Sequence, residues 1–212
     1  MNKRIGIANI KRVLAMATEE ENKQGLAWYK QARLFCRRMS RTYGVSLDVA
    51  IAVLSALSPR NKWANNLRDV ETVLAACKQG LGPNDVRVTT FNANKEKAFR
   101  IVHEGKPILA QTSNKTACFF DNIRHVNSDN LTIDLWAFGV FMGFRACQGT
   151  LTDTQYETIA SCYRSVAKSA GLRPYEVQAI VWITFKRLTA KHNVVQVTPA
   201  NYGQSVTFKV AA

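Results

Sequence analysis

The sequence predicts an all-α protein, organised as one domain or as two small helical lobes that share a cleft. Along most of the 212 residues, apolar side chains recur every three to four positions, which is the spacing of one helix face. Helix-capping residues precede several of these stretches, and glycine or proline follows them. Apolar residues make up 47% of the chain, as expected of a protein with a buried core.

The first half of the chain is predicted to be helical at residues 7–21, 26–43, 47–57, 58–79 and 92–102. Ser46 is placed to cap the very apolar helix 47–57. Ser58-Pro59 is expected to begin the next helix, because proline suits a first helical turn. Gly80 and Gly105 then provide natural helix ends.

The second half is predicted to be helical at residues 115–123, 133–144 and 152–170, and from Pro174 onward. Thr152-Asp153 is expected to cap the long helix that Gly171 ends. The apolar face of the helix that begins at Pro174 is expected to pack against the core. Residues 194–212 are β-branched and polar, which predicts a short irregular segment or a β-hairpin.

The formal net charge of +14 is large for this length. Positive charge of this size promotes binding to phosphate backbones, because each contact releases condensed counterions. The basic residues recur in several segments rather than in one tail, so we expect a nucleic-acid partner. The same charge would also fit a ribosome-bound or RNA-binding protein, or a basic surface without a partner.

Neither a membrane segment nor a metal site is expected. No apolar run reaches the roughly 18–20 residues that span a bilayer, and no secretory signal follows the basic first residues. The five cysteines contain no Cys-x-x-Cys pair, and the three histidines form no ligand pattern. We therefore expect a cytoplasmic protein with reduced thiols and no metal or other cofactor.

Lys115 and Asp134 open two successive predicted helices, and at this spacing their side chains can converge on one cleft. A carboxylate held beside a sugar cation stabilises that cation, as in glycoside hydrolysis. A deprotonated amine can attack the same sugar carbon. The alternatives are a lysine that faces phosphate or water, and an aspartate that only caps its helix.

Several segments, in consistent order, resemble the helix-hairpin-helix, endonuclease III-like superfamily of DNA glycosylases. Residues 53–56 resemble its Leu-Leu-Ser-Ala-Gln segment, and residues 92–98 resemble its Asn-Ser-Lys-Ala helix start. Residues 109–117 fall where the family has Leu-Pro-Gly-Val-Gly-x-Lys-Thr-Ala, and residues 133–136 fall where it has Val-Asp-Thr-His. The resemblance covers roughly residues 47–144.

This resemblance implies a single, two-lobed glycosylase-like (HhH-GPD) domain over residues 1–212, with the hairpin at about 108–125 and a cleft between the lobes. By resemblance, Asp134 stabilises the sugar cation or helps to activate a nucleophile, and Lys115 attacks the sugar and forms a Schiff base. The implied activity is cleavage of the N-glycosidic bond of a damaged or modified base, with AP-lyase activity if Lys115 attacks. The implied partner is duplex DNA with one flipped nucleotide, bound by a monomer.

Further candidates for contacts with DNA lie near helix starts and in the hairpin-like segment. Backbone amides and cations at a helix start favour phosphate. These candidates are Ser58, Arg60, Asn61, Lys62, Asn65, Lys95, Lys97, Gln111, Ser113, Asn114 and Thr116. Trp63 and Trp136 are candidates for the base pocket, and the alternative for each is packing in the core.

The chain also departs from the family pattern. Gln111 and Ser113 replace the hairpin glycines, and Leu57 replaces the glutamine that fills the gap left by a flipped base. The cysteine quartet of the family's iron–sulfur cluster is absent. Residues 174–182 look like a segment of uncharacterised phage proteins, which predicts a divergent phage-type member in the host cytoplasm.

These departures leave two further readings open. One is a phage enzyme that hypermodifies DNA bases on a glycosylase-like fold, with an amine or amino acid displacing pyrophosphate from an activated thymine. The other is a non-catalytic DNA-binding module, in which Lys115 and Asp134 serve only phosphate contacts and helix caps.

Overall fold

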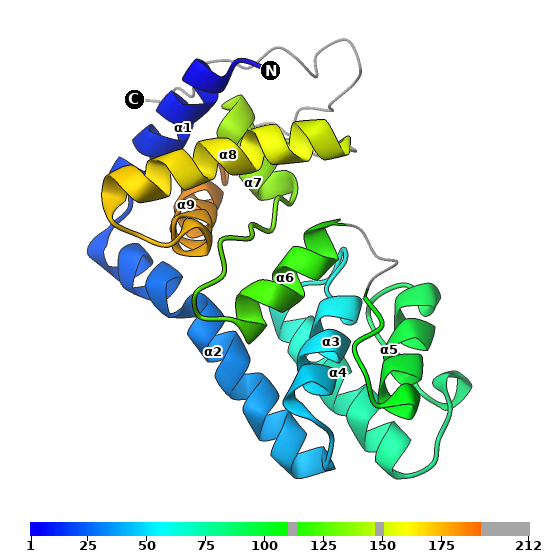
Figure 1. Cartoon of the computed structure of the whole chain (residues 1–212). Helices are drawn as coiled ribbons and strands as arrows, with labels where there is room; N and C mark the ends of the chain where they lie inside the picture. The colour runs from blue at the N-terminus through cyan, green and yellow to red at the C-terminus, as the bar shows by residue number, and fades with distance from the viewer. Residues whose placement is uncertain (110–113, 147–150, 192–212) are drawn as a thin grey trace. The chain divides into compact units, whose positions relative to one another are not determined.

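The computed structural model describes residues 1–109, 114–146 and 151–191, and it confirms the predicted all-α class for this part of the chain. These residues form helices α1 to α9 and one short 3-10 helix, η1 (Figure 1). The chain divides into two compact units. The terminal unit contains residues 1–29 and the chain from residue 127 onward, and the central unit contains residues 30–126.

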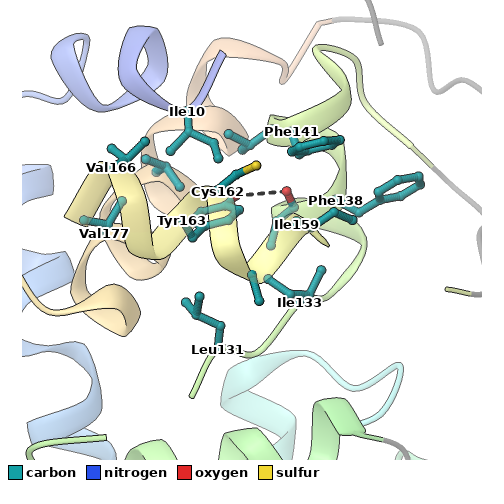
Figure 2. Close-up of a cluster of buried hydrophobic side chains, with 14 of the residues drawn as sticks. Ile10, Leu131, Ile133, Phe138, Phe141, Ile159, Cys162, Tyr163, Val166 and Val177 are labelled. Carbon is teal, nitrogen blue, oxygen red and sulfur yellow. Dashed lines mark hydrogen bonds between the residues drawn. The ribbon is translucent and has the colours of Figure 1, made fainter. Parts of the chain in front are cut away.

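In the terminal unit, four helices pack around one core. They are α1 (Lys3–Ala15), α7 (Leu135–Met142), α8 (Asp153–Ala170) and α9 (Pro174–Leu188). Helix α1 contacts the other three (Figure 1). Figure 2 shows the buried side chains between them, among which Phe138 and Phe141 come from α7 and Tyr163 from α8. This core fixes the position of α7, which begins directly after Asp134.

The first part of α2 (Glu19–Tyr43) also belongs to the terminal unit and crosses α9 at very short range. A Cβ atom at Gly25 would lie 2.7 Å from Ile180 Cα and 2.8 Å from Ile180 N. These are backbone atoms, which cannot move aside as a flexible side chain can. Glycine at position 25 is therefore required for the two helices to approach this closely.

The central unit is built around α3 (Leu47–Leu57), which is buried along its length from Val49 to Leu57. Ser46 caps this helix as predicted, since its side chain accepts a hydrogen bond of 3.1 Å from Val49 N. Helices α4, α5 and α6 contact α3 (Figure 1). Their bounds are Trp63–Lys78, Asn92–Glu104 and Asn114–Arg124, and η1 spans Pro83–Asp85.

The predicted boundary between the first two helices was wrong. The helix predicted at residues 7–21 ends at Ala15, and α2 begins at Glu19 instead of Leu26. Thr18 and Glu21 explain the difference. The Thr18 hydroxyl accepts from Glu21 N at 3.2 Å, and the Glu21 carboxylate accepts from Thr18 N at 2.9 Å. This reciprocal capping box starts a new helix at that point.

The predicted start of the helix after α3 was also wrong. Helix α4 begins at Trp63 and not at Ser58-Pro59. The Ser58 N–H donates back to Ser55 O, and Asn61 N donates to Ser58 O, so these residues form a turn. Arg60 has a positive φ of 53°, a left-handed conformation that is incompatible with a continuous helix.

The ends of α7 are set by its caps, so this helix is shorter than the predicted 133–144. Asp134 is its N-cap, and Gly143 ends it in a left-handed conformation with φ 85°. Helices α8 and α9 begin at the predicted Thr152 cap and at Pro174. The hairpin predicted for residues 194–212 lies outside the described residues. Within the described part of the chain, no helix has the length and apolarity to cross a membrane.

Candidate functional site

Asp134 occupies a fixed position at the N-terminus of α7. Its Oδ1 atom accepts hydrogen bonds from Trp136 N at 3.0 Å and from Ala137 N at 2.8 Å. The residue is half-buried. Asp134 therefore caps α7, which is one of the roles predicted from the sequence. The two hydrogen bonds also fix the orientation of its carboxylate.

The extended segment before Asp134 is held from two sides. Tyr156 of α8 accepts a hydrogen bond from Ile133 N at 3.0 Å, and its hydroxyl donates to Leu131 O. Thr132 is buried, and its Oγ1 lies 3.4 Å from the hydroxyl of Tyr29 on α2. The backbone that carries the Asp134 carboxylate therefore has little freedom to rearrange.

Tyr163 lies in the core beneath this helix start. Its side chain is fully buried and donates a hydrogen bond of 2.9 Å to Ala137 O. Burial raises the pKa of Tyr163 well above its usual value, and the charges of Asp134 and Cys162 raise it further. Tyr163 therefore stays neutral and acts as a support of α7 rather than as a proton donor to a substrate.

Trp136 is half-buried, and positively charged side chains lie over its ring. Arg145 Cζ lies 5.4 Å and Lys186 Nζ 5.8 Å from the ring centroid. The ring also meets Phe185 edge to face, at 6.5 Å between centroids. Trp136 thus combines packing against the core with a partly exposed surface near cations.

Trp182 and Trp28 extend this group of aromatic rings, although neither was among the candidates predicted from the sequence. Lys186 Nζ also lies 4.7 Å from the ring centroid of Trp182, one helical turn earlier on α9. The Trp182 ring meets Trp28 of α2 edge to face at 5.7 Å. We name Trp28, Trp136, Arg145, Trp182 and Lys186 the aromatic–cation cluster. The four-residue spacing of Trp182 and Lys186 was a signal in the sequence, but their pairing with Trp28 depends on the helix crossing.

Lys115 lies in the first turn of α6, in the central unit, and is half-buried. Its neighbour Thr116 is buried, whereas Asn114 is exposed. Lys115 and Asp134 belong to different units, so their predicted convergence on one cleft stays a prediction. Gln111 and Ser113 lie outside the described residues.

The candidates in residues 58–62 are partly used by an internal hydrogen-bond network around Asp69, which is only 4% exposed. Asn61 Nδ2 donates to Asp69 Oδ2 at 2.8 Å and to Leu57 O at 3.1 Å. Thr89 donates its N–H to Asp69 Oδ2 at 3.0 Å, and its hydroxyl lies 2.6 Å from the same oxygen. This Asp69 network ties residues 58–62 to the chain just before α5.

Other predicted DNA contacts in the central unit have internal partners too. Ser58 Oγ donates to Ser55 O at 2.9 Å, and Lys95 Nζ donates to Val86 O at 3.1 Å. Asn65 Oδ1 accepts from the guanidinium of Arg68. Trp63, at the start of α4, is half-buried.

The remaining cations have different surroundings. Arg60 and Lys62 are exposed, and Lys97 is half-buried. Arg60 is the residue with the positive φ in the turn that the Asp69 network anchors. Its guanidinium is therefore carried by a backbone of defined conformation.

Cys36 and Cys77 are poorly suited to act as nucleophiles. Burial raises the pKa of Cys36 to about 12 and that of Cys77 to about 11. A thiol that stays protonated is a poor nucleophile and a poor metal ligand. No group of histidine, cysteine and acidic side chains suited to a metal occurs among residues 1–109, 114–146 and 151–191.

The part of the chain that the structure describes is all-α, with a carboxylate fixed at the start of α7 and, on the same helix, a tryptophan with cations over its ring. The chain belongs to DUF7178, a family of unknown function, whose model matches residues 2–189. No curated protein and no solved structure is significantly similar to the chain.

Proposed function

We propose that this protein is a DNA-binding enzyme that flips a nucleotide out of the helix and acts at its sugar or base, with Asp134 as the charge-stabilising residue. The observation that carries the proposal is the geometry of Asp134. The residue is half-buried, and its carboxylate is fixed by the backbone amides of Trp136 and Ala137 at the start of α7.

The proposed reaction depends on the negative charge of Asp134, which is fixed in position and partly shielded from water. When a base leaves the sugar, positive charge develops on the anomeric carbon and the ring oxygen, and a nearby carboxylate lowers the energy of that state. Water then adds to the anomeric carbon while the departing base takes up a proton. Because hydrogen bonds to Tyr156 hold the segment before Asp134, the carboxylate needs little reorganisation.

The net charge of +14 supports DNA as the substrate. Arg145 and Lys186 place positive charge over the ring of Trp136, two residues after Asp134. A base stacks on such a ring while its phosphates pair with the cations. The order of the resembling segments, which lie in α3, α5, α6 and α7, supports a divergent member of the HhH-GPD fold. A phage-type origin and a monomeric state are further parts of this proposal.

A second candidate function is base hypermodification, and the position of Leu57 favours it. This residue stands where the resembled glycosylases have a gap-filling glutamine, and its side chain is fully buried in α3. In this reaction the nitrogen of an amine forms a bond to the activated carbon of the thymine substituent. The carbon–oxygen bond to pyrophosphate breaks, and the amine loses a proton, which Asp134 accepts.

The test measures the products of base release and of amine transfer, and compares the wild-type protein with variants of Asp134 and Lys115. Duplex DNA with varied base lesions is incubated with the protein, and released bases are measured by mass spectrometry. Asp134→Asn should slow base release about 10²–10³-fold, since asparagine caps a helix about as well as aspartate but has no charge. Borohydride trapping reports the lyase, and an adduct should be lost in Lys115→Ala.

DNA with a pyrophosphorylated hydroxymethyl base, given together with an amine, tests the transferase. Release of pyrophosphate with gain of the amine mass would assign the second function. DNA binding that both variants leave unchanged, with no product from any substrate, would instead identify a non-catalytic module and overturn the proposal.

A further inference from the structure

The aromatic–cation cluster joins three elements of the terminal unit that are distant in the sequence. Trp28 lies on α2, Trp136 on α7, and Trp182 with Lys186 on α9. The Lys186 ammonium group lies within 6 Å of two indole rings, at 4.7 Å from the centroid of Trp182 and 5.8 Å from that of Trp136. Both distances are in the range of cation–π attraction.

The cluster is not simply part of the core. The three tryptophans are half-buried and Lys186 is exposed, whereas Tyr29 and Phe185 beside them are buried. The three indole rings are therefore partly exposed to solvent. Edge-to-face contacts hold them in place, at 5.7 Å between Trp28 and Trp182.

The cations of the cluster differ from their neighbour Arg187. Arg187 Nε is paired with Glu21 at 2.7 Å. Among the described residues, Lys186 and Arg145 form no ion pair with a carboxylate. Positive charge without a carboxylate partner, placed over aromatic rings, complements a ligand that has both phosphates and flat bases.

We propose that the aromatic–cation cluster binds unpaired nucleotides of a DNA strand, with a base stacked on Trp182, which Trp28 supports from the side, and phosphates paired with Lys186 and Arg145. This inference rests on the proposed function and adds a strand-binding surface to the Asp134 site. The bases of the bound segment are unpaired, because stacking on a tryptophan requires the face of the base.

The test uses tryptophan fluorescence, because three of the four tryptophans belong to the cluster. The full-length protein is titrated with a thymidine oligonucleotide and with an abasic oligonucleotide of the same length and charge. We expect the thymidine strand to quench the fluorescence and to bind about tenfold more tightly than the abasic strand.

Matched variants locate the effect. Lys186→Gln and Trp182→Leu should each weaken binding of the thymidine strand about tenfold, and Trp182→Phe should restore most of it. Lys168→Gln removes an exposed lysine from α8 in the same unit and should change binding much less. Thermal melting of each variant confirms that it is folded.

The outcomes separate this inference from the proposed function. Equal affinity for the two strands without quenching would overturn the inference, as would folded cluster variants that bind like the wild type. If the wild-type protein still forms product on DNA in either of these cases, the proposed function is retained and only the strand-binding surface is rejected. The cluster variants could lose base-dependent binding while the wild-type protein forms no product from any substrate. That result would support the strand-binding surface and contradict the proposed enzymatic function.

Discussion

The two units use their polar and aromatic side chains in different ways. In the central unit, the carboxylate of Asp69 is 4% exposed and accepts hydrogen bonds from Asn61 and Thr89 of the same unit. In the terminal unit, Asp134 is half-buried and accepts hydrogen bonds from two backbone amides, and Trp136, two residues later, is partly exposed with cations over its ring. Both carboxylates are fixed, but Asp69 is held by side chains and a backbone amide from outside its own helix, whereas Asp134 is held by the first amides of the helix that it caps.

Under the proposed function, we expect this difference to separate residues that maintain the fold from residues that act in the reaction. A buried carboxylate with several internal donors is expected to stabilise a turn. A partly exposed carboxylate, oriented by two amides at a helix start, keeps capacity for a substrate. Changes at the two places should therefore affect different measurements, and the following variants test that expectation.

The largest effect on stability is expected for Gly25→Ala, in the terminal unit. The new methyl group would meet backbone atoms of Ile180 at 2.7–2.8 Å, so α2 and α9 would have to separate. We expect a loss of about 3 kcal/mol in the free energy of unfolding, measured with urea. Gly82→Ala is the control, because a Cβ there meets only an ordinary contact at 3.6 Å.

Asp69→Ala should reduce stability by about 2 kcal/mol, because the N–H of Thr89 and the amide of Asn61 lose their acceptor. The rate of the reaction per folded molecule should stay unchanged, and a single-turnover assay measures it. If the rate falls about a hundredfold in the folded variant, Asp69 takes part in the chemistry and the contrast between the two units is wrong.

The ion pair of Glu21 and Arg187 should make the stability of the terminal unit depend on pH. The hydrogen bond from Arg187 lowers the pKa of Glu21 from 4.5 to about 2. Because the folded-state pKa is the lower one, the stabilisation is complete above about pH 4.5 and is lost as the pH falls toward 2.

Arg187→Gln tests this ion pair. We expect a loss of about 1.5 kcal/mol at pH 6, discounted because half of the Arg187 side chain is exposed. The difference from the wild type should shrink steadily between pH 4.5 and pH 2 in unfolding curves. A difference that is independent of pH would show that Arg187 acts through packing alone.

The smallest effect on stability is expected at Asp134 itself. Asp134→Ala removes the acceptor of two amides and should cost about 1 kcal/mol, whereas Asp134→Asn should cost only a few tenths. Ser46→Ala is a matched control in the central unit, since it removes an uncharged cap from α3. Thermal melting of the three variants checks this order.

The sequence predicted the helical class and those features that depend on neighbouring residues. Ser46 and Thr152 cap α3 and α8 as expected, because a cap depends on residues three positions apart. The capping box of Thr18 and Glu21 was equally local, yet apolar spacing across it suggested one longer first helix. The turn at Ser58-Pro59 was missed because the Asp69 network that holds it comes from distant residues.

The candidate site was predicted only in part, because some of its residues come together through contacts between distant parts of the chain. Asp134 and Trp136 were selected because they are close in the sequence to a recognisable pattern. Trp28 and Trp182 become neighbours only where α2 crosses α9 at Gly25. Such a contact depends on tertiary packing, which the periodicity of one helix does not specify.

The central claim is that the charge of Asp134 promotes a reaction on DNA. The most direct test is the single-turnover rate of Asp134→Asn on the duplex substrate, compared with the wild type at equal folded fraction. We predict a rate about 10²–10³ times lower, with a melting temperature close to that of the wild type. An unchanged rate in the folded variant would contradict the claim.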